Sequence, residues 1–107
     1  MRAWLTDMLK AIELVRSELD GITIQALEAD RRKQWIVERG IEIVSEASRH
    51  LTAALKAGHP GIPWRKAAGT GSVLRHEYQR TAPDILWHAA GGDLPALEVF
   101  CRAELNR

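Results

Sequence analysis

The longest uninterrupted stretch of the chain is residues 30–57, DRRKQWIVERGIEIVSEASRHLTAALKA. It contains no proline and one glycine, and the Gly58-His59-Pro60-Gly61 sequence that follows is typical of a helix end. Its apolar residues recur every three or four positions, which is the spacing that aligns side chains along one face of a helix. The stretch therefore predicts one long amphipathic helix, around which a small helical protein is organised.

This predicted helix has two faces and a border between them. The apolar arc consists of Ile36, Val37, Ile41, Val44, Ala47, Leu51, Ala54 and Leu55. The polar side consists of Glu38, Glu42, Ser45, Arg49 and Lys56. Arg39, Glu46 and His50 fall together on the border, where helical side-chain contacts at the water line are one interpretation.

The residues before this stretch predict one more long helix and a short one. The first helix has a single apolar stripe of Trp4, Met8, Ile12, Val15 and Leu19. Asp20-Gly21 ends it, Thr23 can cap one turn within residues 22–29, and Asp30 can cap the long helix. Charged residues interrupt the first helix at regular intervals, so we interpret it as neither a signal peptide nor a membrane span.

A third helix is expected to begin at Ile62-Pro63-Trp64, because proline is tolerated in a first helical turn. Trp64, Ala67, Gly71, Leu74 and Tyr78 share one of its faces. Gly69 and Gly71 each weaken a helix interior by up to ~1 kcal/mol relative to alanine. We therefore expect another backbone to approach closely there, in a tight helix crossing or a subunit contact.

The rest of the chain predicts a turn at 81–83, a short helix and a final helix. Gly91-Gly92 ends the short helix, and the final helix starts at Asp93, with Leu97 and Cys101 facing inward. The expected fold is all-α, an antiparallel bundle of four to five helices. A chain of 107 residues is expected to form one domain, residues 1–107.

Composition narrows the functional classes. The net charge is only +1, so any basic surface for nucleic acid must be local. Cys101 is the single cysteine, which excludes an intramolecular disulfide and a cysteine-rich metal site and favours the reducing cytoplasm. His50 and His59 lack the further ligands that a metal site needs. We predict no metal and no cofactor.

The stretch with the most chemistry is residues 69–78, GTGSVLRHEY. His76 can exchange a proton near neutral pH, Arg75 is a permanent cation, and Tyr78 carries a phenol. Cutting RNA without a metal needs a base for the 2′-hydroxyl, an acid for the leaving oxygen and a cation for the phosphate. A phosphodiester substrate therefore suits these three side chains.

The chain also resembles a known family. Residues 62–78, with Val73-Leu74-Arg75-His76-Glu77-Tyr78 at their end, resemble the C-terminal motif of the HepT-like proteins of the HEPN superfamily. Residues 41–47, IEIVSEA, and Asp93-Leu94-Pro95 are similar to two further helices of that family, so nearly the whole chain is covered.

The resemblance implies a HEPN-like bundle that acts as the toxin of a type VII-like toxin-antitoxin system. Such a toxin is a metal-independent endoribonuclease, forms a homodimer, acts on an RNA substrate and is neutralised by a minimal nucleotidyltransferase. It implies that His76 is catalytic, that Tyr78 accepts AMP from the nucleotidyltransferase, and that Glu46 supports the site. Support of the site is therefore a second interpretation of Glu46, beside the helical side-chain contacts at the water line.

One position departs from the family pattern. The family's arginine is expected at positions 69–71, where this chain has Gly69, Thr70 and Gly71, and Ser72 replaces the usual asparagine. Arg75, Arg80 and Arg65 are the candidates to replace the arginine, and we favour Arg75 as catalytic, with Ser72 and Arg80 in support. The alternative function is a catalytically silent HEPN domain that binds a nucleotidyltransferase, nucleotide or RNA. A helical bundle without any site is the third possibility.

Overall fold

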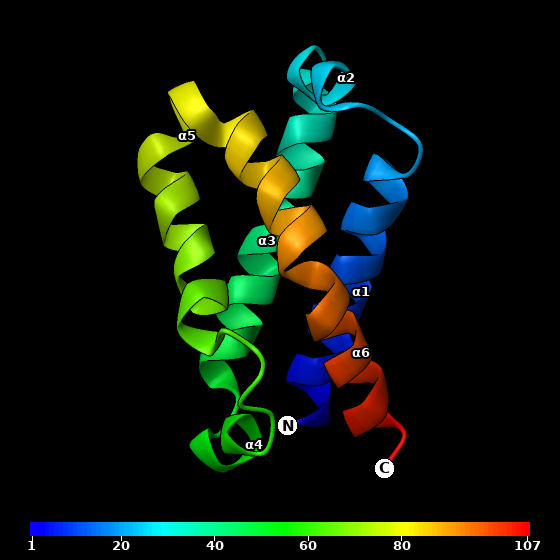
Figure 1. Ribbon diagram of the computed structural model, residues 1–107, viewed down its shortest axis with the longest axis vertical. Helices are drawn as coiled ribbons and strands as arrows, with labels where there is room; N and C mark the ends of the chain where they lie inside the picture. The colour runs from blue at the N-terminus through cyan, green and yellow to red at the C-terminus, as the bar shows by residue number, and fades with distance from the viewer.

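The computed structural model describes the helices along residues 1–107 and the side chains of residues 1–69 and 83–107 (Figure 1). The helices are α1 (Arg2–Leu19), α2 (Ile24–Glu28), α3 (Arg31–His50), α4 (Ala53–Ala57), α5 (Trp64–Gly92) and α6 (Leu94–Leu105). Four are long, while α2 and α4 contain five residues each. The expected all-α fold is confirmed.

Antiparallel packing of α1 against α3 forms one side of the bundle. Lys33 near the start of α3 donates a hydrogen bond of 2.7 Å to Glu18 near the end of α1. At the opposite end, His50 of α3 stacks on Trp4 of α1. Figure 1 shows α6 beside α1, and both chain termini at the same end of the bundle. The long helices therefore enclose a shared core.

Local capping signals set the boundaries around α2 as the sequence predicts. The Thr23 side chain accepts a hydrogen bond of 3.1 Å from the Ala26 amide, and Asp30 accepts one of 3.0 Å from the Lys33 amide. Gly21 has a φ of 74°, a left-handed conformation that ends α1 and is strained for other residues. The predicted ends of α1 and starts of α2 and α3 are confirmed.

The prediction of one continuous helix over residues 30–57 is wrong at its C-terminal end. Leu51 has an extended backbone, with φ −73° and ψ 145°, and its side chain is buried in the core. The Thr52 side chain accepts a hydrogen bond of 3.2 Å from the Leu55 amide and so starts α4 as a separate helix. Ala54, expected on the apolar arc, is exposed because the helix direction changes there.

Helix α5 folds back on itself, so that its two described arms, 64–69 and 83–92, face one another. Ala67 and Ala89 line one small cavity together with Leu97 of α6. In a straight helix they would be separated by about 33 Å along the axis. The reversal is visible in Figure 1.

The sequence predicts two helices joined by a turn at 81–83, whereas the structure assigns a single helix, α5, which includes Pro83 and reverses direction along its length. Thr81 and Ala82 lie outside the described residues. Of the face predicted to unite Trp64 with Tyr78, only Trp64 and Ala67 are described, and Ala67 is buried in the core.

Among the described glycines, Gly40 lies closest to another helix, at the point where α3 crosses α1. A Cβ atom added at Gly40 would overlap Cγ2 of Val15 and lie 3.4 Å from the carbonyl oxygen of Ala11. At Gly69, by contrast, nothing lies within 4 Å of an added Cβ. The expected close approach within the chain is therefore absent at Gly69, and Gly71 lies outside the described residues.

The core is built from apolar faces of α1, α2, α3, α5 and α6. Its largest fully buried apolar side chains are Met8, Ile12, Val15, Leu27, Val37, Leu86, Leu94 and Leu97. Leu97 and Cys101 of α6 face inward, as predicted. None of the described helical segments combines the length and the apolar character that spanning a membrane requires.

Candidate functional site

Most of the predicted site residues lie in the part of α5 whose side chains are not described. These are Ser72, Arg75, His76, Tyr78 and Arg80. Glu46 on α3 is the predicted site residue whose contacts are visible. The candidate site is therefore built from Glu46 and from the contacts that hold the first arm of α5 just before residue 69.

Glu46 is the centre of a charged cluster on α3. Its carboxylate accepts hydrogen bonds of 2.5 Å from Arg49 and 3.0 Å from Nε2 of His50. The Arg49 guanidinium and, secondly, His50 hold the pKa of the Glu46 carboxyl below its usual value. These are contacts between residues one turn apart at the water line, as the first interpretation of Glu46 and His50 predicts.

Arg39 does not belong to this cluster, although the sequence groups it with Glu46 and His50. Its guanidinium lies 3.6 Å from the carboxylate of Glu42, one turn further along α3. Glu46 is seven residues away from Arg39, or about 10 Å along the helix axis. The spacing of four residues between Glu46 and His50 indicates a contact, whereas the spacing to Arg39 does not.

Arg49 connects the charged cluster to α5. While one nitrogen of its guanidinium binds Glu46, another donates a hydrogen bond of 2.7 Å to the carbonyl oxygen of Ala68. Ala68 immediately precedes Gly69, where the chemically rich stretch begins. Helical periodicity predicts a position for Arg49 on the polar side of α3 and gives no indication of this contact between helices. The spacing of three residues indicates the pair of Arg49 with Glu46, whereas no local pattern indicates the bond to Ala68.

Ser45 holds the same arm of α5 from inside the bundle. The sequence predicts a position on the polar side of α3, but its side chain is 1% exposed. Its hydroxyl donates a hydrogen bond of 2.8 Å to the carbonyl oxygen of Ala67. The expectation is wrong because α5 covers that side of α3. Two successive carbonyls, at Ala67 and Ala68, are thus bonded to α3 directly before residue 69.

His50 also takes part in an aromatic contact that its position in the sequence does not indicate. Its ring stacks on Trp4 with the centroids 4.0 Å apart and an angle of 1° between the planes. Glu46 binds the ring edge at Nε2, so the carboxylate and the indole fix the imidazole from two directions. The arrangement joins the start of α1 to the end of α3 next to Arg49.

The tryptophans were expected to anchor the core or a subunit interface. Trp4, Trp64 and Trp87 are half-buried and pack against the core. Trp64 also donates hydrogen bonds of 3.1 Å to the carbonyls of Lys56 and His59. Trp35 differs, because it is 62% exposed on α3. Three of the four are therefore core residues, and Trp35 is a surface residue.

The described side chains offer no group of metal ligands and no reactive thiol. Among them, no three His, Cys, Asp or Glu residues lie close enough together to hold a metal ion. Cys101 is fully buried, and burial, followed by the charge of Glu98, raises its thiol pKa to about 12. The prediction that Cys101 is a small buried core residue is confirmed.

Comparison with known proteins identifies the family. A family model described as "Ribonuclease HepT-like" matches residues 8–104. A "Probable ribonuclease HepT" of Thermococcus cleftensis is 34% identical over 95 residues, covering 89% of this chain and 86% of that protein. A "Putative RNase" of Methanocaldococcus jannaschii is 26% identical over 98 residues, covering 92% of this chain and 90% of that protein. No solved structure gives a significant match. With the helical fold and the match along almost its whole length, the chain belongs to the HepT-like ribonuclease family.

Proposed function

We propose that this protein is a metal-independent endoribonuclease that cuts RNA by attack of a 2′-hydroxyl on the neighbouring phosphate. The observation that carries the proposal is the family match over residues 8–104, which includes His76 and its neighbours. The match covers 86% and 87% of two relatives named as ribonucleases, so the activity in their names concerns proteins of similar length.

In this mechanism His76 exchanges the protons and Arg75 carries the charge. A neutral imidazole takes the proton of the 2′-hydroxyl as that oxygen bonds to phosphorus. The bond from phosphorus to the 5′-oxygen breaks to leave a 2′,3′-cyclic phosphate, and the leaving oxygen takes up the proton that His76 has accepted. Arg75 stabilises the negative charge that builds on the phosphate oxygens, and its two parallel N–H donors suit them. Ser72 and Arg80 support the bound phosphate.

The described contacts support this proposal by fixing where the catalytic stretch begins. Ser45 and Arg49 bind the carbonyls of Ala67 and Ala68. Glu46 orients Arg49 through a second hydrogen bond. We therefore assign Glu46 a positioning role that acts through Arg49. This combines the two sequence interpretations, because a contact at the water line can also support a neighbouring site.

We further propose that the protein is the toxin of a toxin-antitoxin pair. Its partner is a minimal nucleotidyltransferase that transfers AMP to the Tyr78 phenol, and the active form is a cytoplasmic homodimer. Light scattering tests the dimer, since a monomer mass at micromolar concentration contradicts it. Mass spectrometry tests the modification, because AMP transfer adds a nucleotide to wild type and not to Tyr78→Phe.

A second candidate function is a silent HEPN domain that binds RNA or a nucleotidyltransferase without cleavage. The observation that favours it is the glycine at position 71, where the family arginine is expected. The two functions differ in one measurable property. The silent domain binds RNA or its partner and leaves labelled RNA intact, whereas the enzyme cuts it.

The decisive experiment is cleavage of labelled RNA in the presence of EDTA by wild type and by His76→Ala. We expect His76→Ala to lose activity and to retain its helical circular dichroism spectrum. His88→Ala is the matched control, because His88 is an exposed histidine of the same helix. Equal activity of wild type and His76→Ala contradicts the catalytic role. A wild type that binds RNA and never cuts it favours the silent domain.

A further inference from the structure

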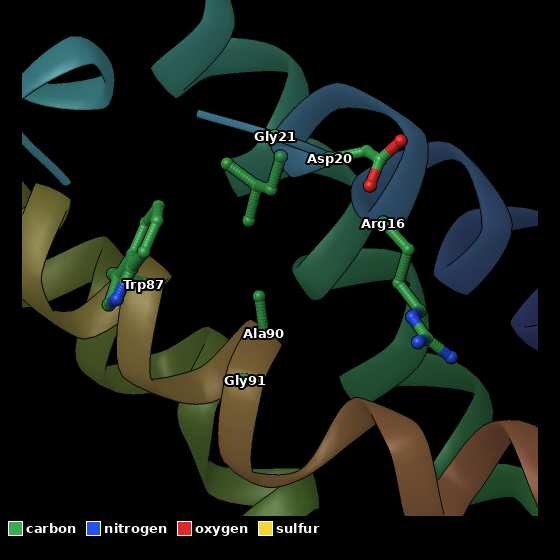
Figure 2. A pocket seen from close by; sticks show the side chains of 7 residues that line it. Arg16, Asp20, Gly21, Trp87, Ala90 and Gly91 are labelled. Carbon is green, nitrogen blue, oxygen red and sulfur yellow. The ribbon is translucent and has the colours of Figure 1, made fainter. Parts of the chain in front are cut away.

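An open cavity of about 310 Å³ lies between the end of α1 and the second arm of α5 (Figure 2). None of its described lining residues has a role in the proposed catalytic site. They are Arg16, Leu19, Asp20, Gly21, Trp87, Ala90 and Gly91. The left-handed turn at Gly21 shapes the α1 end of the cavity, and Trp87 with the small residues Ala90 and Gly91 forms the α5 side. The cavity is therefore a separate feature of the fold.

The lining combines an aromatic ring with charged groups on the opposite side. Figure 2 shows Trp87 on one side and Arg16 and Asp20 on the other, with the charged ends of Arg16 and Asp20 directed away from Trp87 and with Ala90 and Gly91 between the two sides. A half-buried indole presents a π-face on which any nucleobase can stack. A guanidinium attracts phosphate, and a carboxylate can accept a hydrogen bond from a base amino group. Together these groups match one nucleotide.

Arg16 is held in place without being removed from solvent. Its guanidinium pairs with Glu98 of α6, yet its side chain remains 51% exposed. Glu98 binds Arg102 as well, at 2.9 Å, so the carboxylate remains paired when Arg16 turns toward a ligand. An arginine carries five N–H donors, and one recorded contact leaves donors for a phosphate oxygen. The Arg16 guanidinium is thus accessible at the rim, and it can bind a phosphate in the cavity by turning from Glu98 toward the ligand.

We propose that this cavity binds one nucleotide of single-stranded RNA, with its base on Trp87 and its phosphate on Arg16. The inference rests on the proposed function, since RNA must be the substrate for its nucleotides to reach the cavity. A base enters such a cavity only when it is unpaired and unstacked, which restricts the ligand to a single strand. On this proposal the cavity adds affinity for RNA and takes no part in cutting the bond.

Gly91 allows the cavity to be filled without disturbing the packing around it. Nothing lies within 4 Å of a Cβ atom added at Gly91 or at Gly92. Both glycines are exposed near the end of α5, but only Gly91 is among the described lining residues. Gly91→Leu adds a side chain at a residue that lines the cavity, and Gly92→Leu is the matched control. Both changes favour the helix equally, because leucine has a higher helix propensity than glycine.

The test measures binding of a short labelled 2′-O-methyl RNA, which has no 2′-hydroxyl to attack, by fluorescence anisotropy at fixed salt. We expect about tenfold weaker binding for Gly91→Leu and for Trp87→Leu, which is the effect of losing one stacked base. Gly92→Leu and Trp35→Leu should bind as wild type does. Circular dichroism establishes that each variant is folded.

The cleavage assay distinguishes failure of this inference from failure of the proposed function. We expect Gly91→Leu to raise KM for unmodified single-stranded RNA and to leave kcat unchanged, because a site that only binds one nucleotide contributes equally to the bound substrate and to the transition state. Equal binding by the Gly91 and Gly92 variants overturns the nucleotide site, even when wild type cuts RNA. A wild type that neither binds nor cuts RNA overturns both proposals. Binding without cleavage, still weakened by Gly91→Leu, overturns the enzyme and supports the site.

Discussion

Ser45 of α3 donates a hydrogen bond of 2.8 Å to the carbonyl oxygen of Ala67 in α5, and both side chains are buried. Since Arg49 bonds to the next carbonyl along the chain, α3 holds α5 at two successive residues. The first contact is protected from water and the second is at the surface. This double attachment sets the starting position of the stretch that carries His76.

Ser45→Ala removes the buried half of this attachment. We expect the free energy of unfolding to fall by about 1 kcal/mol, because a buried carbonyl loses a partner inside the protein. Urea unfolding followed by circular dichroism measures the change. Ser17→Ala is the control, since Ser17 is exposed on α1 and its loss should leave the midpoint nearly unchanged. Equal midpoints for the two variants contradict a stabilising role for Ser45.

Gly40→Ala tests the close crossing of α1 and α3. Alanine favours a helix over glycine by up to ~1 kcal/mol, but overlap with Val15 costs about 1 to 3 kcal/mol. We therefore expect net destabilisation, whereas Gly92→Ala, which meets nothing within 4 Å, should stabilise slightly.

The double variant Gly40→Ala/Val15→Ala tests whether overlap with Val15 causes the loss of stability in Gly40→Ala. Removing the overlapping methyl groups should make the double variant more stable than the sum of the two single changes predicts. Thermal or urea unfolding of the four proteins gives this coupling. Strict additivity shows that the added Cβ destabilises by some route other than Val15.

Glu98 should give the protein a pH-dependent stability. Hydrogen bonds from Arg102 and then Arg16 hold the pKa of the Glu98 carboxyl below its ordinary value of 4.5. A lowered pKa in the folded state stabilises the protein above pH 4.5, and this contribution disappears as the pH falls through the folded-state pKa. Wild type should therefore exceed Glu98→Gln in stability at pH 7, with a gap that narrows below pH 4.5.

Urea unfolding of wild type and Glu98→Gln over a pH series measures this gap. Glu28→Gln is the control, because Glu28 is an exposed carboxylate on α2. High salt should also narrow the gap, since the arginines around Glu98 are half exposed and salt screens their attraction. If the difference in stability between wild type and Glu98→Gln widens as the pH falls, the ion pairs of Glu98 are not its source.

Cys101 should resist alkylation in the folded protein. Burial and the nearby charge of Glu98 raise its thiol pKa to about 12, so about one thiol in ten thousand is ionised at pH 8. The side chain is also inaccessible to reagents. Reaction with iodoacetamide at pH 8 should proceed only as the protein opens, and denaturant should accelerate it strongly. Rapid labelling of the native protein contradicts the buried position.

Cleavage of labelled RNA with EDTA present tests which arginine stabilises the charge on the phosphate in the transition state. Arg75→Ala should reduce the rate by about a hundredfold, the typical effect of removing one transition-state charge contact. Arg75→Lys should also lose much of the rate, because lysine provides a point charge in place of two parallel donors. Arg65→Ala, which removes an exposed cation at the start of α5, should mainly weaken binding and its salt dependence. Full activity in Arg75→Ala with loss in Arg80→Ala assigns the role to Arg80.

The boundaries around α2 were predictable from sequence because their causes are local. Thr23 and Asp30 cap amides three residues away, and Gly21 adopts a conformation that its own lack of a side chain permits. Such contacts need no distant partner. The family resemblance was also readable from sequence, because the motif around His76 is a pattern of residues.

Only the tertiary structure decided which sides of the helices are covered. Ser45 belongs to a polar side by helical periodicity, yet α5 buries it, and the close crossing occurs at Gly40 instead of Gly69. Leu51 leaves helical geometry and is buried in a core shared by several helices. The physical reason is that periodicity assigns residues to faces of one helix, whereas burial depends on which neighbour packs against each face.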